Sequence, residues 1–146
     1  RGRIVQRGSA RDLVERPATR FIAEFVGPTN IFGGAARGET AFTSEDGIAI
    51  RLAAPAAGAT LVSIRPERIR MRAARPDEVL AAANAVRGKL AESGYRAAAR
   101  VSTVMLASGR SVIVSESIER LEAEIPLGAD VVLDWDPASV VPLADG

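Results

Sequence analysis

Two segments of the chain share one pattern, in which an alternating run leads to a proline corner and then to a second apolar run. These segments are residues 58–69 and 128–140, and they align after the insertion of a single residue. Each follows a hairpin pattern with a glycine in its turn, at residues 46–47 and 108–109. A repeat of this kind indicates a fold made of two similar small β units.

The corner of the first segment is Arg65-Pro66-Glu67. A proline cannot donate a hydrogen bond to a sheet, so it belongs at an edge, a bulge or a strand boundary, and it keeps the preceding residue extended. We therefore expect a rigid corner that displays Arg65 and Glu67 on either side. The alternation beyond it puts Arg68 and Arg70 on an exposed face. These five residues are candidates for contact with another protein surface; the alternative is that their charges are simply solvated.

Composition limits the function classes. The 146 residues are 47% hydrophobic, enough for one ordinary domain or two very small ones. Basic and acidic residues number 19 and 18, which leaves no general field to attract nucleic acid or an anionic membrane. The chain has no Cys or His, which excludes disulfides, Cys/His zinc sites and a histidine base.

No apolar run approaches the ~20 residues of a membrane-spanning helix. Eighteen arginines beside the single Lys89, with many alanines, suggest a GC-rich bacterial source.

Residues 1–28 differ in pattern from the rest of the chain. Ser9 and Asp12 resemble a capping box, and Gly27-Pro28 is a helix stop signal. Between them lies an apolar stripe with helical spacing, formed by Phe21, Ile22, Phe25 and Val26. We expect a short strand and then a helical segment here. The start lacks Met and a signal peptide, which suggests a chain cut from something longer.

From residue 29 onward the period changes from 3.6 to 2. The predicted fold is mainly β, with two similar small β units preceded by the N-terminal helical segment. The two similar halves are expected at about residues 29–73 and 87–146, with residues 74–86 as a connector or a short helix. In the second half, the alternation over residues 130–136 puts Val131, Leu133 and Trp135 on one face of a strand. The opposite face carries Asp130, Val132, Asp134 and Asp136.

Two motifs carry a family resemblance. The pattern P-A-x-R-F-I-A-E-F-V-G-x-x-N at residues 17–30, with S-I-R-P-E-R-I at 63–69, resembles the C-terminal part of bacterial ATP-binding-cassette (ABC) import ATPases. That family includes polyamine, ferric-iron, sugar and molybdate importers. Residues 1–28 resemble the end of its nucleotide-binding domain, and residues 29–146 resemble its TOBE-type regulatory domain. One departure is Gly94-Tyr95-Arg96, where many members carry an aromatic-x-Gly element.

The resemblance implies a fold of one or two small OB-like β-barrels. It also implies a regulatory and dimerisation domain of an importer of the polyamine, iron or sugar class. It implies a second copy of the chain, an upstream ATPase domain and, indirectly, membrane permease subunits as partners. The location would be cytoplasmic, at the inner membrane. The parent protein would use ATP and Mg²⁺. This chain contains no G-x-x-x-x-G-K-[ST] loop, no signature motif and no switch histidine, so we expect it to be non-catalytic and to hold no cofactor.

Three other functions are compatible with parts of the sequence but have less support. An oxyanion-binding module of the molybdate type could use Ser93, Arg96 and Ser111 with backbone N–H groups. A nucleic-acid-binding OB-fold is remote, because it needs a basic track and stacking aromatics, and aromatics are only 4%. An enzyme or cation site could use Asp134 and Asp136, which alternate onto one strand face. Such strand carboxylates are more often solvated, so we expect neither a catalytic nor a metal site.

Overall fold

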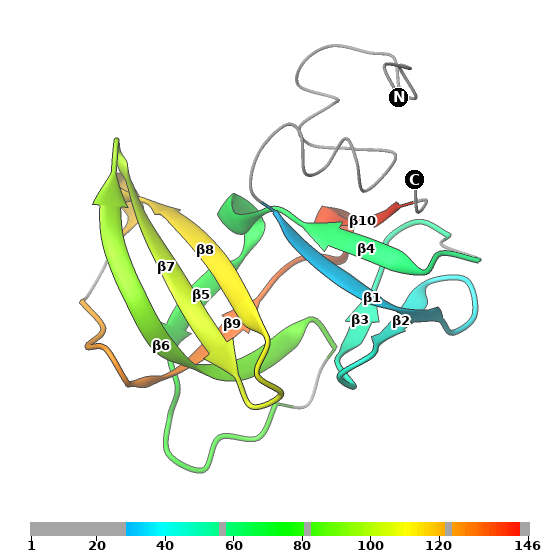
Figure 1. Ribbon diagram of the computed structural model, residues 1–146, viewed down its shortest axis with the longest axis horizontal. Helices are drawn as coiled ribbons and strands as arrows, with labels where there is room; N and C mark the ends of the chain where they lie inside the picture. The colour runs from blue at the N-terminus through cyan, green and yellow to red at the C-terminus, as the bar shows by residue number, and fades with distance from the viewer. Residues whose placement is uncertain (1–28, 56–57, 81–82, 122–123, 144–146) are drawn as a thin grey trace. The chain divides into compact units, whose positions relative to one another are not determined.

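The computed structural model describes residues 29–55, 58–80, 83–121 and 124–143. The helical segment expected at residues 9–26 lies outside this range. Within it, the chain forms β-strands and short 3₁₀ turns, and every strand pair is antiparallel. The strands form two five-stranded sheets (Figure 1). No helix in the described ranges is long and apolar enough to cross a membrane.

The first sheet has the strand order β10-β4-β1-β2-β3. Its strands are β1 (Asn30–Ala36), β2 (Ala41–Ser44), β3 (Ala49–Arg51), β4 (Leu61–Ile64) and β10 (Val140–Leu143). The Asp46–Gly47 turn joins β2 to β3 as predicted, with Gly47 at a φ of 88°. The Ser44 hydroxyl fixes this turn, because it donates to Asp46 Oδ1 at 2.6 Å and accepts from the Ile48 N–H at 2.9 Å. The core of this unit includes Phe32, Phe42, Ile50 and Val62.

The second sheet has the strand order β5-β9-β6-β7-β8. Its strands are β5 (Arg70–Ala73), β6 (Ala85–Arg96), β7 (Ala99–Leu106), β8 (Ser111–Ser117) and β9 (Asp130–Asp134). The three long strands β6, β7 and β8 curve strongly (Figure 1), and a register shift interrupts β6 between Leu90 and Glu92. The predicted Ser108–Gly109 turn joins β7 to β8, with Gly109 at a φ of 90°. The curled sheet leaves β5 and β8 as its two edge strands.

The predicted repeat is visible as the same succession of elements. In the first copy, β4 is followed by the 3₁₀ turn η1 (Pro66–Arg68) and β5; in the second, β9 is followed by η3 (Pro137–Ser139) and β10. Each corner carries the chain into the other sheet, because β5 pairs with β9 and β10 pairs with β4. The compact units therefore comprise residues 66–136 on one side, and residues up to 65 together with those from 137 on the other.

These units do not follow the sequence halves 29–73 and 87–146, because the last strand of each half pairs in the opposite sheet. Alternation sets which side chains share a face, but it does not choose the partner strand. A second difference concerns β4 and β9, which are buried on both faces. Val132 was expected on the face opposite Val131 and Leu133, yet it is 1% exposed, and Ser63 of β4 is also 1% exposed. A strand that is covered on both faces loses the clean alternation of a half-buried strand, as the burial patterns of β4 and β9 show.

Candidate functional site

The predicted corner is present as the 3₁₀ turn η1, closed by an Ile69 N–H bond to the Pro66 carbonyl at 3.3 Å. Pro66 is buried, whereas Glu67 and Arg68 are exposed. Arg65 is partly buried and belongs to the first compact unit, while residues 66–70 belong to the second. The structure therefore groups four of the five candidate contact residues in one unit and places Arg65 in the other.

Arg70 is held by two carboxylates of β9 and its C-terminal end. The β5–β9 register sets it opposite Asp134. Its Nε donates to Asp134 Oδ1 at 2.5 Å, and its Nη2 donates to Asp136 Oδ1 at 3.1 Å. The hydrogen bonds to Asp136 and then Asp134 raise the pKa of Arg70. The two aspartates considered above as a cation or acid–base pair are thus bound to a guanidinium. No group of three or more metal-ligating side chains occurs in the described residues.

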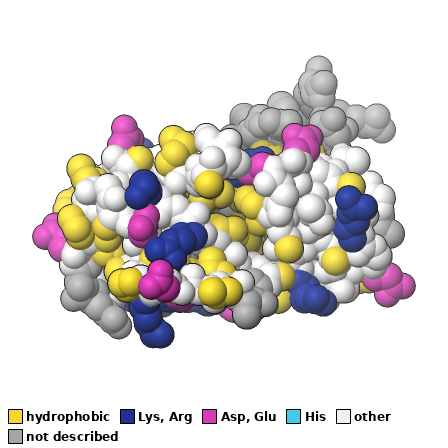
Figure 2. Space-filling view, turned by 90° about the horizontal axis from the view of Figure 1, so that it is seen from below, with side chains coloured by type: hydrophobic (Ala, Val, Ile, Leu, Met, Phe, Trp, Pro, Cys, Tyr) yellow, Lys and Arg dark blue, Asp and Glu magenta, His cyan; other side chains and the backbone are white. Residues whose placement is uncertain are grey.

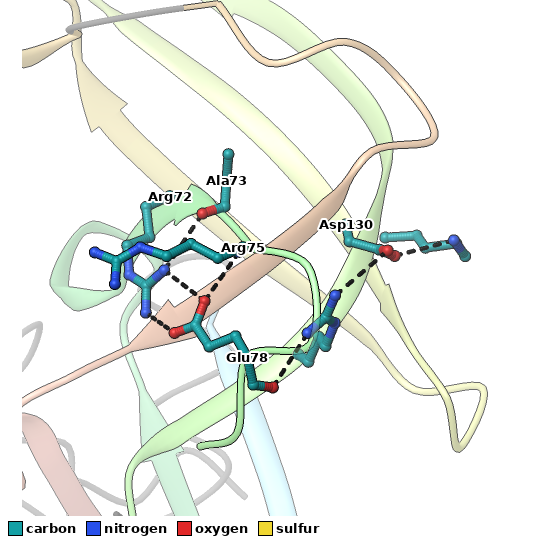
Figure 3. Close-up of polar contacts among 7 residues, drawn as sticks. Arg72, Ala73, Arg75, Glu78 and Asp130 are labelled. Atoms are coloured by element: carbon teal, nitrogen blue, oxygen red, sulfur yellow. Dashed lines mark hydrogen bonds and ion pairs between the residues drawn. The ribbon is translucent and has the colours of Figure 1, made fainter. Parts of the chain in front are cut away.

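Arg72, two residues further along β5, is paired with Glu78 of the following loop (Figure 3). Its Nη1 donates to Glu78 Oε1 at 3.0 Å, and the Arg75 backbone N–H donates to the same oxygen at 3.0 Å. The hydrogen bond from Arg72, followed by that from the Arg75 backbone, lowers the pKa of Glu78 to about 2. Arg72 of β5 therefore anchors the 74–80 loop through Glu78.

A second carboxylate anchors the neighbouring strands β6 and β9 (Figure 3). Lys89 Nζ lies 3.0 Å from Asp130 Oδ1, and Arg87 Nη2 lies 3.6 Å from Asp130 Oδ2. The Lys89 hydrogen bond is the main cause that lowers the pKa of Asp130. On the face drawn in Figure 2, Lys and Arg side chains lie among Asp and Glu side chains.

A cavity of about 850 Å³ lies within the second unit. Its wall is formed by Glu67, residues 69–73, residues 96–100, residues 115–117 and, from the following segment, Arg120 and Ile125. The two edge strands, β5 and β8, and the β6–β7 turn therefore all line this cavity. Three of the predicted residues, Glu67 and Arg70 from the corner and Arg96 from the oxyanion hypothesis, line one space.

The other two predicted oxyanion residues lie elsewhere. Ser93 lines a separate cavity of about 440 Å³, and its Oγ is 3.3 Å from Ser102 Oγ. Ser111 opens β8 opposite Met105, three residues along β7 from Ser102, which corresponds to roughly 10 Å. The structure therefore does not gather Ser93, Arg96 and Ser111 around a common point.

Arg100 and Glu116 are site residues that the sequence reasoning missed. They lie opposite each other on β7 and β8, and Arg100 Nη2 donates to Glu116 Oε1 at 2.9 Å. Arg100 is only 5% exposed and lines both cavities. The sequence did hold a signal, because Arg100 occurs in phase with Ser102, Val104 and Leu106, which are the buried positions of β7. An arginine in a core phase is unusual unless it is paired.

Residues 62–143 match the sequence profile described as TOBE domain. The chain belongs to the TOBE domain family. The matched residues include the motif at 63–69 and confirm its TOBE-type resemblance. The mainly β architecture of two small curled sheets agrees with the predicted fold class. TOBE domains are non-catalytic, in agreement with the expectation that this part of the protein performs no enzymatic reaction.

Curated relatives match this chain over more residues than the TOBE profile does. The chain is 34% identical over 145 residues to the spermidine/putrescine import ATP-binding protein PotA of Marinobacter nauticus, covering 92% of this chain and 37% of the relative. It is 32% identical over 148 residues to the uncharacterised ABC transporter ATP-binding protein YdcT of Escherichia coli, covering 99% of this chain and 37% of that relative. The chain thus spans little more than a third of either relative.

A solved structure shares the fold. The cytoplasmic molybdate-binding protein ModG, with molybdate bound, superposes with a TM-score of 0.61 at 15% sequence identity. The alignment covers 79% of this chain and 96% of ModG. At this identity the similarity establishes that the TOBE domain shares the OB-like architecture of ModG.

Proposed function

We propose that this TOBE domain is the regulatory, C-terminal part of the ATP-binding subunit of an ABC importer. The observation that carries the proposal is the similarity to import ATP-binding proteins over 92% and 99% of the chain, at 34% and 32% identity. In such a protein the ATP and Mg²⁺ would be held by the nucleotide-binding domain. The residues of this chain contain no phosphate-binding loop for them. The subunit would act at the cytoplasmic face of the membrane, beside permease subunits.

We further propose a polyamine as the imported solute, with ferric iron and sugars as the remaining members of the predicted class. The support is the printed function of the Marinobacter relative, spermidine and putrescine import. The test is uptake of radiolabelled spermidine, ferric iron, maltose and molybdate by cells in which this gene is deleted. The proposal expects loss of spermidine uptake and its recovery when the gene is restored. Unchanged spermidine uptake with loss of another solute would refute the polyamine assignment.

The domain would also support self-association of the subunit, with the η1 corner as the contact. Glu67 and Arg68 are exposed at the corner, and the buried Pro66 holds them on a short rigid turn. A short rigid turn loses little conformational freedom when it is bound, which favours association. The partly buried Arg65 is a less direct candidate, because its replacement would also disturb packing.

Sedimentation equilibrium over a wide concentration range tests this contact. We expect Glu67→Ala and Arg68→Ala to weaken dimerisation by about tenfold, while Arg65→Ala weakens it with some loss of stability. Arg37→Ala, an exposed arginine in the β1–β2 turn, is the matched control and should leave dimerisation unchanged. If all four variants dimerise as strongly as the wild type, the corner is not the interface.

Oxyanion binding of the molybdate type is the second candidate, supported by the molybdate-bound structure of ModG. The three side chains considered for it, Ser93, Arg96 and Ser111, are separated in the structure, as described above. Thermal unfolding with molybdate, tungstate or sulfate distinguishes the two functions. A melting temperature that rises with molybdate concentration would favour the oxyanion function, because a ligand that binds only the folded state stabilises it.

A further inference from the structure

The inward-facing row of β7 changes from apolar to polar at one end. Leu106 and Val104 are buried core residues, whereas the next two inward positions are Ser102, which is fully buried, and Arg100, which is 5% exposed. Apolar burial drives a sheet of this size to fold, so a buried guanidinium must be compensated by partners. The polar end of the row lies where the large cavity opens between β5, β7 and β8.

Arg100 is compensated only in part. Its Nη2 is bonded to Glu116 at 2.9 Å, but its Nε is enclosed by the protein and has no hydrogen-bond partner there. Buried donors are nearly always satisfied in native proteins, and a bound molecule is one way to satisfy them. Arg100 lines the cavity, so a molecule held there would contact this residue. A carboxylate suits this position because it can bind a guanidinium through two hydrogen bonds.

Two further arginines strengthen the preference for an anion. Arg96 and Arg120 line the same cavity and are exposed, and their side chains make no hydrogen bond or ion pair within the described ranges. The other cavity arginines, Arg70 and Arg72, are already paired with carboxylates. Glu67 and Glu116 are the acidic residues of the wall, and Glu116 is neutralised by Arg100.

The size and the apolar part of the wall define the rest of the ligand. The volume of about 850 Å³ lies within the range of pockets that hold organic molecules and is far larger than a tetrahedral oxyanion. Ile69, Met71 and Ile125 contribute apolar surface. We propose that this cavity binds a small organic carboxylate, with the carboxylate on Arg100 and the arginines beside it, and its apolar body against these side chains. This inference goes beyond the proposed importer role and does not depend on it.

The experiment uses octanoate as the probe, with ¹⁵N–¹H NMR of the arginine Nε–Hε groups. The Arg100 signal is assigned by its loss in Arg100→Lys, which keeps the charge but removes the Nε donor. We expect octanoate to shift the Arg100 signal in a saturable way, because its carboxylate completes the hydrogen bonding of Nε. An Arg100 signal that does not move at saturating octanoate would overturn the proposal.

A double variant, Arg96→Gln with Arg120→Gln, tests the anion preference without altering a buried residue. We expect it to weaken octanoate binding by about tenfold, as the loss of charge-assisted contacts implies. Arg37→Gln is the control outside the second unit and should bind octanoate like the wild type. Equal weakening by the control and the double variant would refute a specific site. Molybdate is the competing probe: if molybdate but not octanoate shifts the Arg100 signal, the cavity is an oxyanion site and the carboxylate proposal is wrong.

Discussion

Gly33 and Gly34, adjacent in β1, should respond in opposite ways to the same substitution. A Cβ on Gly34 would lie 2.1 Å from the Thr43 carbonyl oxygen and 2.8 Å from Ser44 Cα, both in the backbone of β2. These atoms cannot move aside without separating the two strands. A Cβ on Gly33 would lie 3.0 Å from Glu45 Oε1, the flexible end of a side chain that can rotate away. A comparison of the two alanine variants therefore separates the effect of the backbone clash from the intrinsic cost of glycine in a strand.

The magnitudes follow from two terms. Replacement of glycine by alanine in a strand is favoured by roughly 0.5–1 kcal/mol, because glycine loses more conformational freedom on folding. At Gly34 this gain is outweighed by overpacking of about 1–3 kcal/mol and by weakened pairing of β1 with β2, which spans three residue pairs. We expect Gly34→Ala to lower the free energy of unfolding by about 3 kcal/mol. Gly33→Ala should be neutral or raise it by up to about 1 kcal/mol.

Urea unfolding followed by circular dichroism measures both variants. The midpoint should fall for Gly34→Ala and stay or rise for Gly33→Ala, with m-values close to that of the wild type. Equal midpoints for the two variants would refute the argument, because only the backbone contact distinguishes them. An altered m-value would instead indicate that the unfolding no longer involves the same two states.

Two other expectations concern the second unit. Because the pKa of Glu78 is lowered from 4.5 to about 2, its pairing with Arg72 contributes stability above pH 4.5 that is lost as the pH falls toward 2. Urea midpoints measured from pH 6 to pH 2 should therefore converge for the wild type and Glu78→Gln, and a constant difference would contradict this. In the β6–β7 turn, Ala97 has a φ of 53°, a conformation that costs a non-glycine residue about 1 kcal/mol or more. Ala97→Gly should stabilise by roughly 0.5–1 kcal/mol and Ala98→Gly should destabilise by a similar amount, so a lower melting temperature for Ala97→Gly would contradict the strain argument.

The candidate site could be predicted only in part from the sequence. The corner at Pro66 was predictable because proline is disfavoured in the interior of a strand. The structure shows a 3₁₀ turn there. The cavity was not predictable, because it needs β5, β7 and β8 together, and their adjacency depends on how the sheet curls. Arg100 was overlooked because a charged residue in an alternating run is normally assigned to the solvent side.

The sequence by itself determined the local elements: the period-2 strands, the glycine turns at residues 47 and 109, the proline corners and the repeat that joins them. These depend on backbone sterics and on the alternation of side chains, which act over a few residues. Tertiary structure alone decided that β5 pairs with β9 and β10 with β4. Pairing between strands some 60 to 80 residues apart is set by the packing of whole faces, and the alternation of each strand is compatible with more than one partner. The buried position of Arg100 and the cavity around it are consequences of that choice.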